Sequence, residues 1–440
     1  MQIGPALRRL WRHAPFRRLL ILRILSQAGD GTLQVGMASY ILFSPQSQPD
    51  AWAIAGVLAI TLLPFTIIGP FVSTLLDRWS RRQVTVISDM VRATLGLLIG
   101  LLIAFGLTDG LWQVAFYGAL LVAMSVNRFM LAGLSAGLQY TVEPDEYLTS
   151  SSIIPTVGPL GVVIGAVLGF VARVGLGPVL GANRADAVVF FVAAMLFTGS
   201  VMVARGFHRD ALGPEPGQPR STAGEVWRGL GVALRHLRTR PAAELALLGM
   251  FVSRLLFGLF SVAVILAIRN FFNTDPNEAL ADLTLWGLAT GAGFIVCTVV
   301  VPTLTRRLGL LRTAITVLGV AAVAQTVAAL SPVMWVLFVA SFFIGVGVQS
   351  FKICIDTVVQ AHVDERYKGR VFTFYDVGFN SAFVLAAVIA ALTLPDTGIS
   401  SVGFGVMALA YVALAAGFGV AARRIGAATF EKGTEDLTGP

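Results

Sequence analysis

Charged residues are scarce in this sequence of 440 amino acids. Asp, Glu, Lys and Arg together make up 13% of the chain, whereas apolar residues make up 56%. Roughly a quarter of the residues in an average soluble protein are charged, and a soluble shape of this size cannot hide so much apolar surface. The scarcity of charge therefore argues against a soluble protein and predicts a chain that lies in lipid.

Cysteine and histidine are also rare. The two cysteines, Cys297 and Cys354, are isolated within apolar stretches, so they give neither a disulfide framework nor a metal-binding spacing. All four histidines fall in predicted loops or tails. We therefore expect no metal, no cofactor and no membrane-embedded enzyme. A sensor or scaffold would need a soluble domain, which the predicted loops are too short to hold.

The net charge of +8 does not indicate a nucleic-acid-binding protein. The basic residues stand in short groups between long apolar runs, which is the pattern that membrane topology produces. We expect no nucleic-acid partner.

Apolar runs that are long enough to cross a bilayer recur along the whole chain. A crossing takes about 20 helical residues, since each residue rises about 1.5 Å. The sequence predicts an all-α integral membrane protein with twelve transmembrane helices in two pseudo-symmetric six-helix bundles. The predicted spans are 19–43, 51–76, 84–107, 111–138, 150–173, 185–204, 243–268, 284–305, 311–331, 333–358, 371–394 and 400–422.

The distribution of basic residues orients these spans. We place 24 of the 32 Lys and Arg residues in the tails and in the loops that follow even-numbered helices. The opposite side receives only Arg173, Arg184 and Arg269, and the rest lie within spans. Cytoplasmic loops carry the excess of basic residues, so we expect a multi-pass protein of the plasma membrane with both termini cytoplasmic.

The segment 205–240 is the longest predicted loop. Its Gly- and Pro-rich stretch 213–219 is typical of a flexible linker. The following residues, 221–239, predict an amphipathic helix whose arginines reach anionic headgroups. We expect an N-terminal six-helix bundle at 1–204, a cytoplasmic linker at 205–240, and a C-terminal six-helix bundle with a short tail at 241–440.

The loop between the second and third spans carries a motif. Residues 73–82 read Ser-Thr-Leu-Leu-Asp-Arg-Trp-Ser-Arg-Arg. This run resembles the signature loop of the major facilitator superfamily, although Ser73 and Ser80 stand where that family usually has glycine. The resemblance implies two bundles around a midplane cavity that opens alternately to each side, and a small-molecule substrate. We expect the chain to act as a monomer.

Charged loops on the cytoplasmic side predict an inner gate. An aspartate at this end of the second helix can face the positive N-terminus of a neighbouring helix or a nearby arginine. The acidic loops after the fourth and tenth helices echo each other, as an internal repeat would, and they could pair with the arginines. The candidate gate residues are Asp77, Arg78, Arg81, Arg82, Glu143, Asp145, Arg306, Arg307, Asp364 and Asp376.

Charges within the spans are the strongest functional candidates, because each is disfavoured in lipid by a few kcal/mol. They are Asp30, Arg128, Arg254, Lys352 and Asp356. Asp30 lies between glycines in the first span, where a carboxylate could bind and release a proton. The alternative is a permanent ion pair with Arg128 or Arg254. Lys352 and Asp356, at i and i+4, could simply neutralise each other.

Three further charges, Arg23, Asp89 and Arg92, lie closer to the cytoplasmic ends of their spans, so we expect them to reach the interface as structural residues.

Small residues in the fifth span predict a close helix contact. Gly158, Pro159, Gly161 and Gly165 recur at helical spacing and leave room for a neighbouring backbone. This stretch resembles the glycine-proline motif of proton antiporters in the superfamily, but the paired glycines are missing.

The local sequence around Asn127-Arg128-Phe129 and Lys368-Gly369-Arg370 resembles that of the actinobacterial multidrug and siderophore exporters of the superfamily. The resemblance implies export of a small amphiphilic molecule by proton antiport, with protons and membrane lipids as further partners. A lipid or lysolipid transporter, a uniporter and an importer on the same fold remain open.

Overall fold

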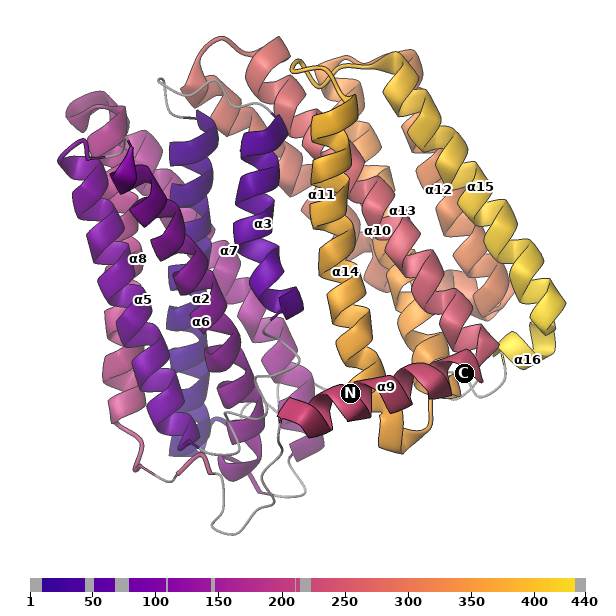
Figure 1. Ribbon diagram of the computed structural model, residues 1–440, viewed down its shortest axis with the longest axis horizontal. Coiled ribbons are helices and arrows are strands. Elements are labelled where there is room, and N and C mark those ends of the chain that lie inside the picture. Colours follow the sequence, from indigo (N-terminus) through magenta and orange to yellow (C-terminus); the bar gives the residue numbers. More distant parts are fainter. Residues whose placement is uncertain are drawn as a thin grey trace. The chain divides into compact units, whose positions relative to one another are not determined.

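The computed structural model shows an all-helical chain (Figure 1). It describes residues 10–43, 51–67, 79–107, 110–143, 147–209, 211–213 and 223–431. The helical class predicted from composition is confirmed.

Ten of the described helices are long and apolar enough to cross a membrane. Each overlaps one of the predicted spans from the third to the twelfth. They are α5 (Arg81–Ala104), α6 (Leu111–Gly137), α7 (Tyr147–Leu180), α8 (Ala182–Arg205), α10 (Pro241–Ala267), α11 (Pro276–Leu308), α12 (Leu310–Leu330), α13 (Met334–His362), α14 (Glu365–Thr393) and α15 (Ser401–Ile425).

The first two predicted spans correspond to less typical helices. Helix α2 (Ala14–Phe43) is long, but polar side chains such as Arg23, Gln27 and Asp30 lower its hydropathy, and these three are buried by neighbouring helices. Helix α3 (Ala51–Ile67) is a shorter apolar helix. The rest of the predicted span 51–76 lies outside the described residues.

Contacts divide the chain into two compact units, and the first comprises residues 1–46 and 67–226. Within it, α2 packs along α7 and α8, and α5 packs along α8 and α6. An apolar cluster at one end joins Phe16 of α2 to Met130 and Leu134 of α6. The same cluster includes Phe207 and Leu212, so the chain directly after α8 is part of this unit.

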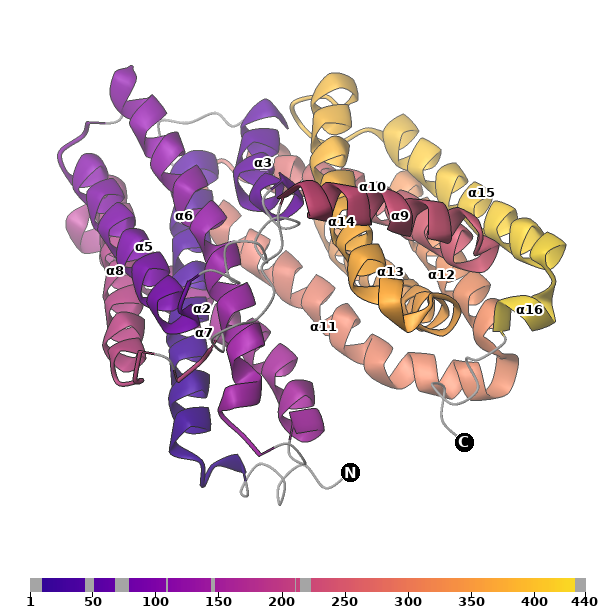
Figure 2. The same cartoon turned by 60° about the horizontal axis from the view of Figure 1, so that its bottom comes forward.

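The second unit comprises residues 47–66 and 227–440. Helix α13 packs against α10, α11 and α12, while α10 also packs against α14 and α15. A π-helical turn, η4 (Ile268–Phe272), continues α10. The short helix α16 (Ala427–Glu431) follows α15 and contacts α12 (Figure 2). There Glu431 accepts a 2.9 Å hydrogen bond from the Leu311 backbone N–H in the first turn of α12.

The predicted amphipathic helix in the linker is confirmed as α9 (Ala223–Arg238). It runs crosswise to α14 (Figures 1 and 2). Leu230 and Leu237 are buried, whereas Trp227 is exposed. The His236 ring lies against the Tyr367 ring of α14 at a centroid distance of 4.4 Å. Most of α9 is therefore part of the second unit. The stretch 214–222 lies outside the described residues, and the predicted boundaries of the two bundles stay a prediction.

Candidate functional site

A buried cluster of charges lies in the first unit around Asp30. Asp30 is 1% exposed on α2 and forms an ion pair with Arg92 of α5, through Nη2 and Oδ1. Arg92 is fully buried, and its Nη1 donates to Asp89 Oδ1 at 2.8 Å and to Ser26 Oγ at 3.0 Å. The guanidinium also lies over the ring of Phe197, 4.0 Å from its centroid. Arg92 thus forms ion pairs with two carboxylates.

The two carboxylates differ in their surroundings. Asp89 accepts hydrogen bonds from Ser26 Oγ at 2.9 Å and from Ser200 Oγ of α8 at 2.5 Å, in addition to Arg92. Asp30 accepts a hydrogen bond from the other amino group of Arg92, Nη2, and Asn127 of α6 lies beside its carboxylate. With both aspartates ionised, the three charged groups sum to −1.

This geometry corrects two predictions. The ion-pair partner of Asp30 is Arg92, in place of Arg128 or Arg254. Asp89 and Arg92 do not reach the interface, because both are fully buried and bound to each other. Arg128 lies next to Asn127 on α6 and is partly buried.

A second buried ion pair lies toward the other end of α2. Arg173 Nε of α7 donates to Asp186 Oδ1 of α8 at 2.6 Å and to Ser39 Oγ of α2 at 3.1 Å. Ser39 Oγ in turn donates to Asp186 at 2.7 Å. The sequence places Arg173 on the outer side at the end of the fifth span, and the structure shows it buried within α7. This pair carries one charge of each sign and is therefore balanced.

In the second unit, Lys352 and Asp356 form an ion pair along α13. Their Nζ and Oδ2 atoms are 2.8 Å apart, as the i, i+4 spacing predicts, and both side chains are about one quarter exposed. Lys352 Nζ also lies 5.2 Å from the ring centroid of Tyr375 on α14.

Arg254 of α10 is surrounded by aromatic rings. Its guanidinium carbon lies 4.1 Å from the centroid of Phe379, 4.5 Å from Phe383 and 5.3 Å from Phe257. A small cavity separates this group from Lys352 and Gln349 of α13. Among the described residues no carboxylate pairs with Arg254.

The predicted gate arginines of the first unit bind backbone carbonyls. Arg81 Nη1 donates to the carbonyl of Leu212 at 3.3 Å, and its backbone N–H donates to Gly213 at 3.1 Å. Arg82 Nη2 donates to the carbonyl of Arg205, the last residue of α8, at 3.3 Å. Basic side chains often satisfy the last carbonyls of a helix in this way. Three further gate candidates, Asp77, Arg78 and Asp145, lie outside the described residues.

The remaining gate candidates are spread over the ends of other helices. Asp364, directly before α14, pairs with Arg240. The predicted partners are Arg81, Arg82, Arg306 and Arg307. Arg306 Nε donates to the Pro302 carbonyl of its own helix, α11. Arg307 is exposed at the end of α11, Glu143 is exposed after α6, and Asp376 lies within α14.

The Arg240–Asp364 pair is expected to add little stability. The two atoms are 2.8 Å apart, but both side chains are 40% exposed or more, and exposed pairs contribute about 0–1 kcal/mol. A double-mutant cycle with Arg240→Gln, Asp364→Asn and the double variant, read by thermal unfolding in detergent, should give a coupling energy below about 1 kcal/mol. A much larger value would show that Asp364 belongs to a wider network.

Glycines of α7 form a close contact with α2, which we call the glycine seam (Gly161 and Gly165 of α7 with Gly31 of α2). A Cβ atom on Gly165 would lie 1.8 Å from the Ala28 carbonyl oxygen, and one on Gly31 would lie 2.0 Å from that of Val162. The two backbones therefore touch directly.

The other two residues of the predicted packing motif, Gly158 and Pro159, precede this seam on α7. Gly158 lies against the Arg23 guanidinium of α2. The side chain of Pro159 is exposed, so it is not buried in the contact.

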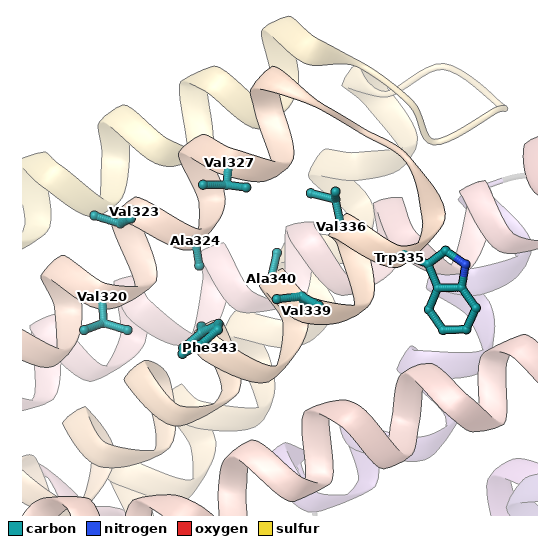
Figure 3. A pocket seen from close by; sticks show the side chains of 9 residues that line it. All are labelled: Val320, Val323, Ala324, Val327, Trp335, Val336, Val339, Ala340 and Phe343. Carbon is teal, nitrogen blue, oxygen red and sulfur yellow. The ribbon is translucent and has the colours of Figure 1, made fainter.

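An apolar groove of about 500 Å³ lies between α12 and α13 (Figure 3). Its lining residues are Val320, Val323, Ala324, Val327, Trp335, Val336, Val339, Ala340 and Phe343. A specific binding site needs a few polar groups that fix the orientation of its ligand. This lining offers none beyond the indole N–H, so the candidate site is assigned to the charged clusters instead.

The sequence matches one family model in two overlapping stretches. Residues 19–387 and 246–435 match the model described as Major Facilitator Superfamily. The chain belongs to the major facilitator superfamily. It is therefore a membrane transporter and not an enzyme.

Curated relatives of this major facilitator chain carry the same family description. Uncharacterized MFS-type transporters of Mycobacterium bovis and Mycobacterium tuberculosis are each 34% identical to it over 388 residues, covering 87% of this chain and 86% of the relative.

Solved structures of the superfamily share the fold. The nucleoside transporter NupG superposes with a TM-score of 0.65 at 14% identity, covering 93% of this chain and 99% of that one. An auto-inhibited peptide transporter of the POT family superposes with a TM-score of 0.64 at 13% identity, covering 93% and 97%. At such low identity these structures show the fold alone.

Sequence reasoning does not find the partners of Asp30 in this major facilitator chain. Asp89 and Arg92 are treated as interfacial, and Ser26 and Ser200 carry no signal of their own. Two features of the sequence could have indicated these partners. Asp89 and Arg92 are an acid and a base three residues apart in an apolar helix, and Asp186 is a charged residue inside the sixth predicted span.

Proposed function

We propose that the chain is a secondary active transporter that exports a small amphiphilic molecule, a drug-like compound or a siderophore, in exchange for protons. In this proposal twelve transmembrane helices form two six-helix bundles, 1–204 and 241–440, joined by the cytoplasmic linker 205–240. The chain acts as a monomer in the plasma membrane, with both termini cytoplasmic. Its family and its ten apolar helices support this proposal.

The charge balance around Arg92 carries the proposal of proton coupling. Two buried carboxylates, Asp30 and Asp89, face one guanidinium. An uncompensated charge in such a place is disfavoured by several kcal/mol. One proton removes the excess, so the cluster has a physical reason to take up a proton and, after a change of surroundings, to release it.

Asp30 is the carboxylate that takes the proton in this mechanism. The hydrogen bonds from Ser26, Ser200 and Arg92 hold the charge on Asp89. Asp30 has fewer donors, and the neighbouring Asn127 amide can donate to its ionised form and accept from its protonated form.

Protonation of Asp30 then changes how two helices are held. The ionised carboxylate ties α2 to α5 through its ion pair with Arg92. In the neutral form this ion pair is lost, and the hydrogen bonds of Ser26 to Arg92 and Asp89 remain between the two helices. In the outward state Asp30 takes an external proton as substrate leaves. In the inward state it releases the proton and substrate enters from the cytoplasm or inner leaflet. Arg128, Lys352 and Asp356 supply the other charges of the site.

The ion pair of Arg173 and Asp186 serves as an internal comparison. It is equally buried and also joins α2, α7 and α8, but its charges balance without a proton. We assign it a structural role and assign coupling to Asp30.

We also keep the inner gate as a proposal. The signature loop with Asp77 and Arg78, together with Glu143 and Asp145, would close the cytoplasmic side against the charged ends of α11 and α14. Arg81 and Arg82 contribute by fixing the chain after α8 to the start of α5 within the first unit.

Purified protein in liposomes that contain a pH-sensitive dye tests the coupling. Anionic, neutral and cationic amphiphiles are added outside to wild type and to Asp30→Asn. We expect one class to drive proton movement in wild type, and we expect Asp30→Asn to bind it while proton movement falls at least tenfold. Asn keeps the shape of the side chain but cannot carry the proton.

Asp396→Asn is the matched control, because it removes an exposed carboxylate from the turn after α14. It should leave proton movement unchanged. If substrate crosses the membrane in wild type and in Asp30→Asn without any proton movement, antiport is wrong and a uniporter or lipid carrier replaces it.

A further inference from the structure

The aromatic pocket around Arg254 holds a positive charge that pairs with no carboxylate in the described part of the chain. Arg254 makes ring contacts with Phe257, Phe379 and Phe383, and none of its N–H groups donates a hydrogen bond to a described residue. A guanidinium stays charged at any ordinary pH. Ring faces stabilise such a cation only in part. An anion would stabilise the guanidinium further, and the described residues do not supply one.

The cavity beside Arg254 is small, about 10 Å³, which is room for roughly one water-sized group, and its wall adds polar side chains to the guanidinium. Its wall includes Lys352 and Gln349 of α13 and Ser253 of α10. The Ser253 hydroxyl is buried and has no hydrogen-bond partner within the described residues. Lys352 is neutralised by Asp356 at 2.8 Å, which leaves one net positive charge at the cavity, on Arg254.

The rest of the lining is apolar. Met250 and Phe379 face the same cavity, and Phe383 and Phe257 continue the aromatic surface beyond the guanidinium. A ligand that fits both parts has an anionic head and an apolar body. Carboxylate and phosphate oxygens match the planar donor pattern of arginine.

We propose that the molecule this transporter moves carries a carboxylate or phosphate group, which binds Arg254 while its apolar body lies against the phenylalanine rings. This inference rests on the proposed transport function and narrows its substrate class. The anion comes either from a soluble amphiphile or from a lipid headgroup, since both present the same oxygens.

Binding to purified protein in a neutral detergent tests the proposal. Decyl phosphate and decanoate are compared with decyl glucoside and decyltrimethylammonium, which share the ten-carbon chain but are neutral or cationic. We expect both anions to bind at least tenfold more tightly than the other two. Arg254→Gln should remove that preference, and Arg254→Lys should retain part of it.

Two controls separate the anion site from general effects of charge and folding. Arg312→Gln removes an exposed arginine from α12 and should leave the affinities unchanged. Arg423→Gln removes an exposed arginine from the end of α15 and should change the affinity for decyl phosphate less than threefold. If Arg254→Gln does not fold, Arg254→Lys and Phe379→Leu still test the site, because each should weaken anion binding.

Competition identifies the source of the anion. Phosphatidic acid in nanodiscs that displaces decyl phosphate supports a lipid headgroup, and failure to displace it supports a soluble amphiphile. Equal affinity for all four decyl probes, or anion binding that survives in Arg254→Gln, would overturn the inference. Proton-coupled transport of a cationic amphiphile would then leave the proposed function standing, whereas Arg254-dependent binding without transport would overturn only that function.

Discussion

Arg92→Met is expected to lower the free energy of unfolding by about 3–5 kcal/mol, the range for breaking one partner out of a buried ion pair. The substitution leaves Asp30 and Asp89 buried side by side without their guanidinium. It also removes the cation from the ring of Phe197. Thermal and denaturant-induced unfolding in detergent, followed by circular dichroism, would measure the loss.

A rescue variant makes this prediction specific. Adding Asp30→Asn to Arg92→Met removes one of the two uncompensated charges, so we expect it to restore part of the lost stability. Asp30→Asn alone should change stability by less than about 1 kcal/mol, because it neutralises the excess charge of the cluster. A double variant no more stable than Arg92→Met would show that packing of the arginine, and not charge, is responsible.

Gly165→Val should prevent the first unit from packing, with a loss of about 3 kcal/mol or more, at the upper end for overpacking. The obstacle is the Ala28 carbonyl at 1.8 Å from the new Cβ, which is backbone and cannot turn aside as a side chain can. The yield of monodisperse protein after detergent extraction, followed by thermal unfolding, would report the effect.

Gly175→Ala is the matched control on the same helix. A Cβ at Gly175 meets no atom within 4 Å, and alanine is the better helix former by about 0.5–1 kcal/mol. The control should therefore be as stable as wild type or more stable. Equal behaviour of the two variants would mean that α2 and α7 do not make the close contact described here.

Much of the fold could be predicted from the sequence, because lipid leaves few solutions for apolar runs of about 20 residues. The ten apolar helices coincide with predicted spans, and the amphipathic helix α9 was expected within one or two residues of its ends. Helix α2 was also expected, although its polar side chains keep it out of the ten apolar helices.

The site could be predicted only in part. Asp30, Lys352 and Asp356 stand out because charge in a membrane span is rare. Their partners depend on which helices pack together, and a sequence gives no depth or rotation for a helix. From the sequence, Arg92 is therefore predicted to be interfacial. In the structure it is buried between α2 and α8 and binds Asp30 and Ser26.

The glycine seam also sets a limit on how this protein can diverge. Gly31 and Gly165 each meet the backbone of the other helix, so every other amino acid is excluded at both positions at once. The neighbours of Arg254 are side chains of α10, α13 and α14, and a substitution among them changes the shape of the pocket without a clash between backbones. Relatives that transport a different substrate should therefore differ in the residues around Arg254. They should keep glycine at the positions of Gly31 and Gly165.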